Sequence, residues 1–173
     1  MMFLLLSLLM TAPLPPSSRI QAALGEQSVK LLLGSRGAEV GWLRVRPALE
    51  AEQATLSSSQ RVVGYPPTER LVAVDREKAG RLTELLLRDD SYSFGRRMRC
   101  ANQRLIGMRF LDGGAEFAIG VPCYQAFWAF RRDGRVERSG EAFSKVATEA
   151  IKAIVRTELE QSGERTAGEK KRR

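Results

Sequence analysis

The sequence contains no histidine. This absence removes the usual general base of enzymes, the commonest side-chain ligand for transition metals and every nucleophile that an imidazole activates. Paired carboxylates would be another route to acid–base catalysis, and Asp89-Asp90 is the only adjacent acidic pair. Neighbouring side chains point in different directions, so we interpret this pair as the exit of a helix. The sequence predicts a protein that is not an enzyme and holds no cofactor or metal; an enzyme using carboxylates alone is a third hypothesis.

Cysteine is scarce, and the chain has only Cys100 and Cys123. Two cysteines at this spacing form neither a Cys-x-x-Cys redox centre nor, without further ligands, a zinc site. A disulfide between them would enclose one predicted hairpin and stabilise the fold by roughly 3.5 kcal/mol in the chain-entropy description. The alternatives are two buried free thiols or one reactive thiol. We expect the structural disulfide.

No hydrophobic run is long enough to cross a bilayer. The apolar stretch Phe3–Met10 has about eight residues, whereas a membrane-spanning helix needs ~20. Its length is typical of the apolar part of a signal peptide, although Met1-Met2 before it carries no Lys or Arg. We expect residues 1–23 to be a signal peptide and the protein to be periplasmic or secreted. The alternative is a terminal apolar strand or helix, which Pro13, Pro15 and Pro16 disfavour.

Phosphate-binding loops are also missing. Gly34-Ser35-Arg36-Gly37 and Asp112-Gly113-Gly114 lack the Lys-Ser/Thr pair or the Gly-x-Gly-x-x-Gly spacing of such loops. Both segments are therefore predicted to be turns between regular elements.

Positive charge, in contrast, is abundant: 28 Lys and Arg against 20 Asp and Glu give a net charge of +8. Most of it is scattered, which is typical of a solvated cationic surface, but a few sets are denser. One is Lys170–Arg173 at the end of the chain, and two others flank an aromatic strand in which Trp128 shares a face with Tyr124 and Phe130. These aromatics are more typical of a core than of an exposed platform. The candidate partner-binding residues are Arg96, Arg97, Arg99, Arg104, Trp128, Arg131 and Arg132.

The hydrophobic pattern predicts one α+β domain over residues 24–162. Alternation of apolar residues indicates a three-strand meander over about 104–131, and Asp75 is a favourable N-cap for a helix over Arg76–Arg88. An apolar stripe predicts a C-terminal helix over Glu141–Gln161, capped by Ser139 and ended by Gly163, that covers the sheet. Residues 163–173 are predicted to be a disordered basic tail. The remaining predicted strands are Ser28–Leu33, Glu39–Val45 and Arg70–Val74.

The central part of the chain resembles a group of small bacterial exported or envelope proteins. The matching stretches are Leu85-Leu86-Leu87 with Tyr92, then Cys100-Ala101-Asn102-Gln103-Arg104-Leu105, then Cys123-Tyr124-Gln125-Ala126. Gln103, Leu105 and Ala126 depart from the pattern of the group and delete its histidine and third cysteine. The resemblance implies export and one possible disulfide, and it carries no function over.

Our first hypothesis is therefore an exported, non-enzymatic α+β domain that binds another macromolecule, such as an envelope component, an effector or an enzyme that it inhibits. The second is a cationic nucleic-acid-binding protein that is not exported and uses the central arginines and the Lys170–Arg173 end. The fate of the N-terminus distinguishes the two.

Overall fold

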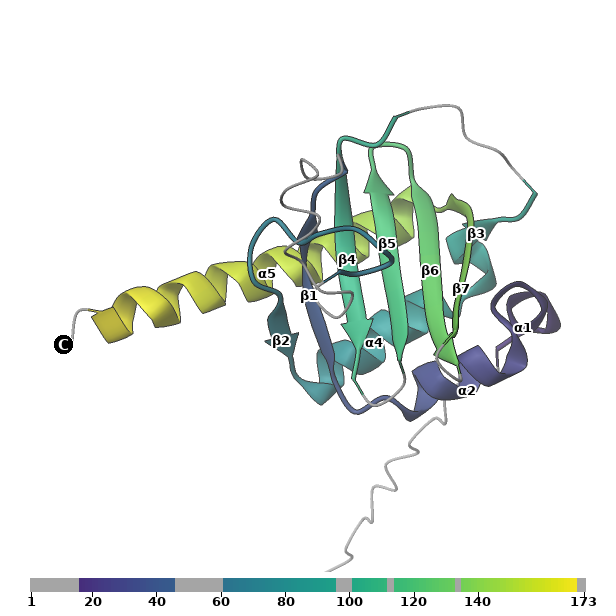
Figure 1. The fold of residues 1–173 in the computed structure, drawn as a ribbon, viewed down its shortest axis with the longest axis horizontal. Coiled ribbons are helices and arrows are strands. Elements are labelled where there is room, and N and C mark those ends of the chain that lie inside the picture. The colour runs from purple at the N-terminus through teal and green to yellow at the C-terminus, as the bar shows by residue number, and fades with distance from the viewer. Residues whose placement is uncertain (1–15, 46–60, 96–100, 112–113, 133–134, 171–173) are drawn as a thin grey trace, which may run out of the picture.

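The computed structural model describes residues 16–45, 61–95, 101–111, 114–132 and 135–170, with only the backbone described for 131–132, 135–139 and 164–170. The fold is α+β, as predicted from the sequence, but its antiparallel sheet is larger than the predicted one (Figure 1). In chain order the described elements are α1 (Ser18–Leu24), α2 (Glu26–Gly34), β1 (Ala38–Leu43), β2 (Val72–Val74), α4 (Arg76–Leu86), the 3-10 helix η2 (Asp89–Ser91), β3 (Tyr92–Ser93), β4 (Arg104–Phe110), β5 (Ala115–Val121), β6 (Gln125–Arg132), β7 (Arg135–Phe143) and α5 (Lys145–Lys170).

The seven described strands follow the order β2-β1-β4-β5-β6-β7-β3. Strands β4 to β7 form a meander of consecutive hairpins, with Met108, Phe117 and Trp128 in register across its first three strands. The two edge strands, β2 and β3, lie at opposite ends of the sheet and are joined through α4, which runs behind the sheet (Figure 1). The predicted meander is therefore confirmed and extended by one strand.

The main core lies between the sheet and the helices, all of which pack on one face (Figure 1). Ile106 and Phe117 from the strands and Leu82 and Ile151 from the helices are each 0% exposed. Burying a side chain of this size stabilises the fold by about 1.5–3 kcal/mol. Among the described residues, no helix combines the length and the apolar character that a membrane span requires.

The N-terminal caps of α4 and α5 can be compared with the caps predicted from the sequence. At α4 the carboxylate of Asp75 accepts a hydrogen bond from the Lys78 backbone N–H at 2.8 Å, as predicted. At α5 the cap is Ser144, whose hydroxyl accepts from the Ala147 N–H at 3.4 Å. The prediction of Ser139 as the cap was wrong because residue 139 lies within β7.

The far end of α5 also differs from the prediction. The helix passes through Gly163 and continues to Lys170, so Gly163 does not end it and the segment up to Lys170 is helical rather than irregular. This last part of α5 projects beyond the sheet (Figure 1).

The predicted strand Ser28–Leu33 is wrong, because these residues belong to α2. Val29 and Leu32 are buried, whereas Lys30 and Leu33 are exposed. This spacing of three places the buried pair on one face of a helix, where both contribute to the main core. The predicted strands Glu39–Val45 and Arg70–Val74 correspond to β1 and β2, with small shifts at their ends.

The opposite face of the sheet is covered differently. Residues 61–71, which we name the strap, cross in front of the strands (Figure 1). They pack on a face rich in small residues, where Gly41, Gly107 and Ala118 stand in register. A Cβ on Gly41 would lie 2.9 Å from a methyl carbon of Leu71. The absence of a side chain at Gly41 thus lets Leu71 of the strap lie directly on the sheet.

Candidate functional site: a basic pocket at the end of β1 and β4

A pocket of about 670 Å³ lies where β1 ends and β4 begins. Leu43 and Leu105 are paired at this point, so the residues that follow Leu43 and those that precede Leu105 reach the same end of the sheet. Thr68 of the strap also lines the pocket. Its described lining residues are Leu43, Arg44, Val45, Thr68, Ala101, Asn102, Gln103 and Arg104.

Backbone hydrogen bonds hold the strap against β1 at this pocket. The Thr68 N–H donates to the Trp42 carbonyl at 2.7 Å, and the Arg44 N–H donates to the Pro66 carbonyl at 3.0 Å. Both bonds continue the ladder beyond the end of β2. The wall formed by Thr68 is therefore fixed by the sheet.

Asn102 is placed by two features on the other side. The neighbouring Gln103 N–H donates to the Val121 carbonyl at 2.9 Å, and the Asn102 amide donates to the Gln125 side-chain oxygen at 3.3 Å. Its side chain occupies the space above Gly120, since a Cβ there would lie 2.1 Å from Asn102 Oδ1. Gly120 is thus required for the observed position of Asn102.

The electrostatic character of the pocket is cationic. Arg44 and Arg104 both line it, and no Asp or Glu is among its described lining residues. The Arg104 guanidinium carbon lies 5.8 Å from the centre of the Trp42 ring, a cation–π contact that restrains this side chain. Thr68, Asn102 and Gln103 add neutral polar groups. This arrangement favours a ligand that carries negative charge and accepts hydrogen bonds.

The structure separates the arginines that the sequence suggested as one partner surface. Arg104 begins β4 and Arg132 ends β6, and these two strands run in the same direction. Arg131 and Arg132 therefore lie at the opposite end of the sheet from Arg104, about 24–27 Å away along the strands at 3.4 Å per residue. Only Arg104 of the described candidates lines the basic pocket. Arg96, Arg97 and Arg99 lie outside the described residues.

Trp128 is not available to a partner. Its side chain is 3% exposed and belongs to the main core, where it makes an edge contact with Tyr92 at 6.1 Å between ring centres. Its prediction as a partner-binding residue is therefore wrong. Trp128 pairs with Phe117 across β5 and β6, so both side chains lie on the face of the sheet that the helices cover. Sequence reasoning missed Arg44 and Thr68, because only strand pairing brings them beside Arg104.

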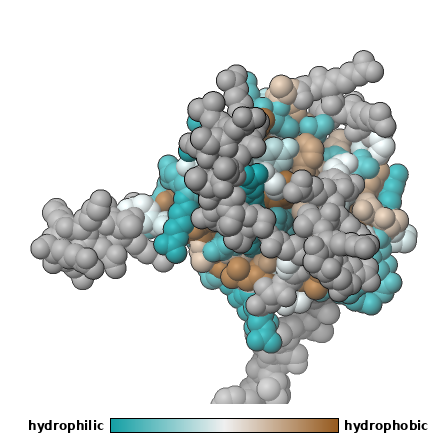
Figure 2. Space-filling view, in the orientation of Figure 1, coloured by the Kyte–Doolittle hydropathy of each residue, from teal (hydrophilic) through white to brown (hydrophobic). Residues whose placement is uncertain are grey.

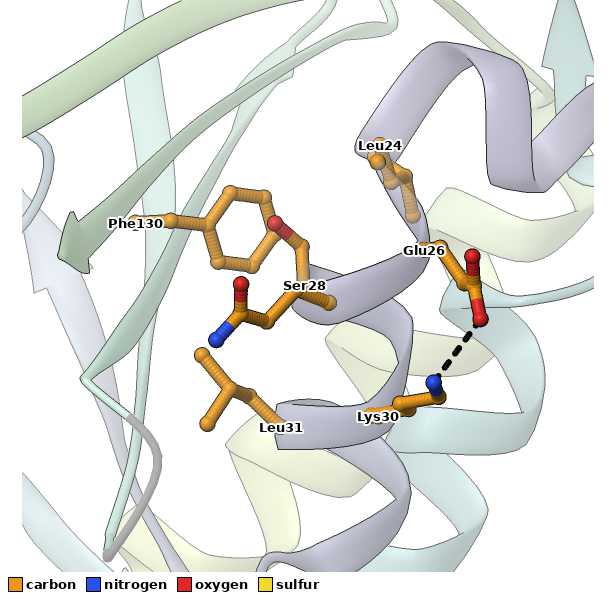
Figure 3. Close-up of a pocket in the computed structure, with 8 residues that line it drawn as sticks. Leu24, Glu26, Ser28, Lys30, Leu31 and Phe130 are labelled. Atoms are coloured by element: carbon orange, nitrogen blue, oxygen red, sulfur yellow. Dashed lines mark ion pairs between the residues drawn. The ribbon is translucent and has the colours of Figure 1, made fainter.

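A second pocket, of about 500 Å³, lies between α2 and β6. In Figure 3, Phe130 faces Ser28 and Leu31, while Glu26 and Lys30 lie on the side away from the ring. Glu26 and Lys30 form an ion pair at 2.8 Å, and this hydrogen bond and the lysine charge lower the pKa of Glu26. Because these two charges balance, this pocket lacks the excess charge of the first.

Charged residues also meet beneath the strap. Arg109 lies between Glu39 and Glu116, at 3.5 and 3.4 Å, and donates to the Arg61 carbonyl at 2.9 Å. Glu116 accepts from the Val63 N–H at 2.8 Å. Val63 has φ 52°, which is unusual for a β-branched residue. The cluster therefore fastens the strap to the sheet in a conformation that its own sequence disfavours.

Cys123 is 1% exposed and is not a free thiol. Cys100 lies outside the described residues, so the pairing of the two cysteines stays a prediction. The described part of the chain brings together no group of three or more Cys, Asp or Glu that could hold a metal ion.

Hydrophobic and hydrophilic residues are interspersed on the side of the molecule shown in Figure 2.

Comparison of this chain with known protein families, with curated proteins and with solved structures finds no match.

Proposed function

We propose that this protein is an exported, non-enzymatic binding domain that takes an acidic segment of a partner protein into the basic pocket. The observation that carries the proposal is Arg104, which a cation–π contact with Trp42 holds at a pocket that has no carboxylate among its described lining residues. A chain without histidine supports the non-enzymatic assignment.

The geometry of the pocket suits recognition rather than turnover. Arg104 would pair with a carboxylate through two parallel hydrogen bonds, and Arg44 adds a second positively charged side chain to the pocket lining. Asn102 and Thr68 are positioned beforehand by the sheet and the strap, so little order is lost when a ligand binds. Since both arginines are exposed, salt should weaken the interaction.

The test is fluorescence anisotropy with a labelled Asp- and Glu-rich peptide and a peptide of the same length in which the acids are amides. Arg44→Glu and Arg104→Glu should each abolish binding of the acidic peptide. Arg81→Glu makes the same charge change on an exposed position of α4 and should reduce binding only slightly. Equal loss in all three variants would show that net charge, not the pocket, attracts the peptide.

A single-stranded oligonucleotide of equal charge serves as the competing ligand. Binding to it that survives physiological salt and exceeds binding to the acidic peptide would overturn the proposal in favour of the nucleic-acid alternative. Under our proposal the oligonucleotide binds weakly and is released at that salt concentration.

The packing of α1 bears on where the proposed export signal is cut. A cut at residue 23 would divide α1 and remove Ile20, which is 0% exposed and packs in the main core. We therefore place the cut between Pro13 and Ser17, which leaves α1 intact. N-terminal sequencing of protein recovered from its host should begin in this interval. A chain that begins at Met1 would contradict export.

We also propose that Cys123 is oxidised to Cys100. Peptide mapping without reductant should recover the linked pair, and Cys100→Ala should lower the free energy of unfolding by about 2–5 kcal/mol. Labelling of a thiol in the folded protein would refute the pairing.

A further inference from the structure

One edge of the sheet is left largely unpaired. Strand β7 pairs with β6 over Arg135–Ala142, but on its outer side β3 pairs only with Phe143 and Ala142. Beyond Ser93 the chain turns away at Gly95, whose φ is 75°, and the Gly95 N–H donates to the Glu141 side chain at 3.2 Å. No described strand therefore pairs with the outer side of residues 135–141.

The backbone groups that this edge presents follow from hydrogen bonds at its end. The Phe143 N–H donates inward to the Tyr124 carbonyl, whereas the Ser144 N–H donates outward to the Ser91 carbonyl. Successive residues of a strand direct their N–H and C=O groups to alternate sides. Gly140, Arg138 and Val136 therefore direct theirs outward, while Ser139 and Glu137 bond to β6.

The other edge of the sheet is short, because its outermost strand, β2, has only three residues. β2 pairs with residues 38–40 of β1, and the strap continues this pairing through Pro66 and Thr68. Among the described strands, β7 offers the longest run of unpaired backbone along a sheet edge, so an assembly through sheet edges would use β7. In a two-fold pair joined through β7, each copy covers the open side of the other's β7, so the assembly stops at a closed pair.

We propose that two copies of this chain pair through β7, antiparallel and centred on Arg138. In this register Arg138 stands opposite its own copy, and Val136 stands opposite Gly140 of the second copy. All three outward-facing residues then form hydrogen bonds, six in all by the two-per-pair rule of such ladders. Shifting the register towards Phe143 is blocked because Ser93 already pairs with Ala142. The two central arginines carry like charge, so added salt strengthens this dimer.

The test is sedimentation equilibrium of the full chain, with Arg138→Pro compared to Arg138→Ala. Proline removes the outward N–H at the centre of the pairing, and a strand tolerates it where that N–H faces solvent. Arg138→Pro should be monomeric at every concentration, with a melting temperature close to that of the wild type. Arg138→Ala makes the same charge change, keeps the N–H and should dimerise at least as well as the wild type.

Amide hydrogen exchange provides a second measurement that needs no substitution. Exchange at Val136, Arg138 and Gly140 should slow as the protein concentration rises, while exchange at Glu137 and Ser139, which bond to β6, should not change. A wild-type chain that stays monomeric at millimolar concentration, or a dimer that Arg138→Pro leaves intact, would overturn the proposal.

Discussion

Replacing Arg109 with methionine tests whether the charged cluster beneath the strap is a structural requirement. Methionine keeps most of the apolar stem of arginine and removes its charge and its hydrogen bonds. In the wild type, the arginine compensates Glu116, whose side chain is only 7% exposed, and donates to the Arg61 carbonyl. The substitution removes the Arg109 guanidinium from both Glu116 and the Arg61 carbonyl.

The expected loss follows from this geometry. Removing one partner of a buried ion pair costs about 3–5 kcal/mol. The Arg109 side chain is 22% exposed, so water replaces part of its contribution. We therefore expect Arg109→Met to lower the free energy of unfolding by about 2–4 kcal/mol.

Urea denaturation measures this change, and a double-mutant cycle with Glu116→Gln identifies its cause. Glutamine still accepts from the Val63 N–H but carries no charge, so Arg109→Met should cost less in that background by at least about 1 kcal/mol. Arg81→Met, at an exposed position of α4, should change stability by under about 0.5 kcal/mol. If Arg109→Met also lowered the free energy of unfolding by under about 0.5 kcal/mol, or if the effects of Arg109→Met and Glu116→Gln were strictly additive, the reasoning would be refuted.

Three further predictions concern the pocket, the core and pH. Gly120→Ala should displace Asn102 and lower the free energy of unfolding by about 1–3 kcal/mol, and the Gly120→Ala/Asn102→Ala double variant should recover this loss. Gly80→Ala, where nothing lies within 4 Å of the new methyl group, should instead stabilise α4. Urea titrations compare the two single variants. Ile151→Ala should cost about 2–5 kcal/mol, and Ile154→Ala less, since Ile154 is only partly buried; equal losses in thermal melts would contradict this difference. Burial raises the pKa of Tyr92, whose hydroxyl donates to the Leu86 carbonyl. Because the unfolded chain loses this proton near pH 10 while the folded chain retains it, the free energy of unfolding should fall as pH rises above about 10. Phenolate absorbance should show that Tyr92 stays protonated until the protein unfolds.

The regular part of the fold could be read from the sequence where apolar spacing is unambiguous. Ile106, Met108 and Phe110 alternate cleanly, and β4 is confirmed. The run Leu31-Leu32-Leu33 is apolar throughout and fits a strand or a helix equally well, so only packing against the core decides that it is helical. Strand β7 was missed because Arg135–Glu141 is mostly polar, as is common where the outer side of a strand is largely unpaired.

The basic pocket could not have been derived from the sequence. Arg44, Thr68 and Arg104 come from three segments, and what unites them is the pairing of β1 with β4 and the path of the strap. Neither is encoded in local spacing. Trp128 illustrates the converse, because its alternation with neighbours was evident but the face that the helices cover was not.

The placement of β2 and β3 at opposite ends of the sheet has a consequence for the order of folding. The meander β4–β7 consists of neighbouring hairpins, whose contacts are short in sequence and form quickly. The segment Val72–Ser93 contains both edge strands, β2 and β3, and the helix α4 between them. The two strands can reach opposite edges only if α4 lies across the back of a sheet that has already formed. We therefore expect this segment to fold last and to dock onto a meander that has already formed. Slow refolding steps should therefore be sensitive to substitutions in α4 and insensitive to those in the β4–β5 hairpin.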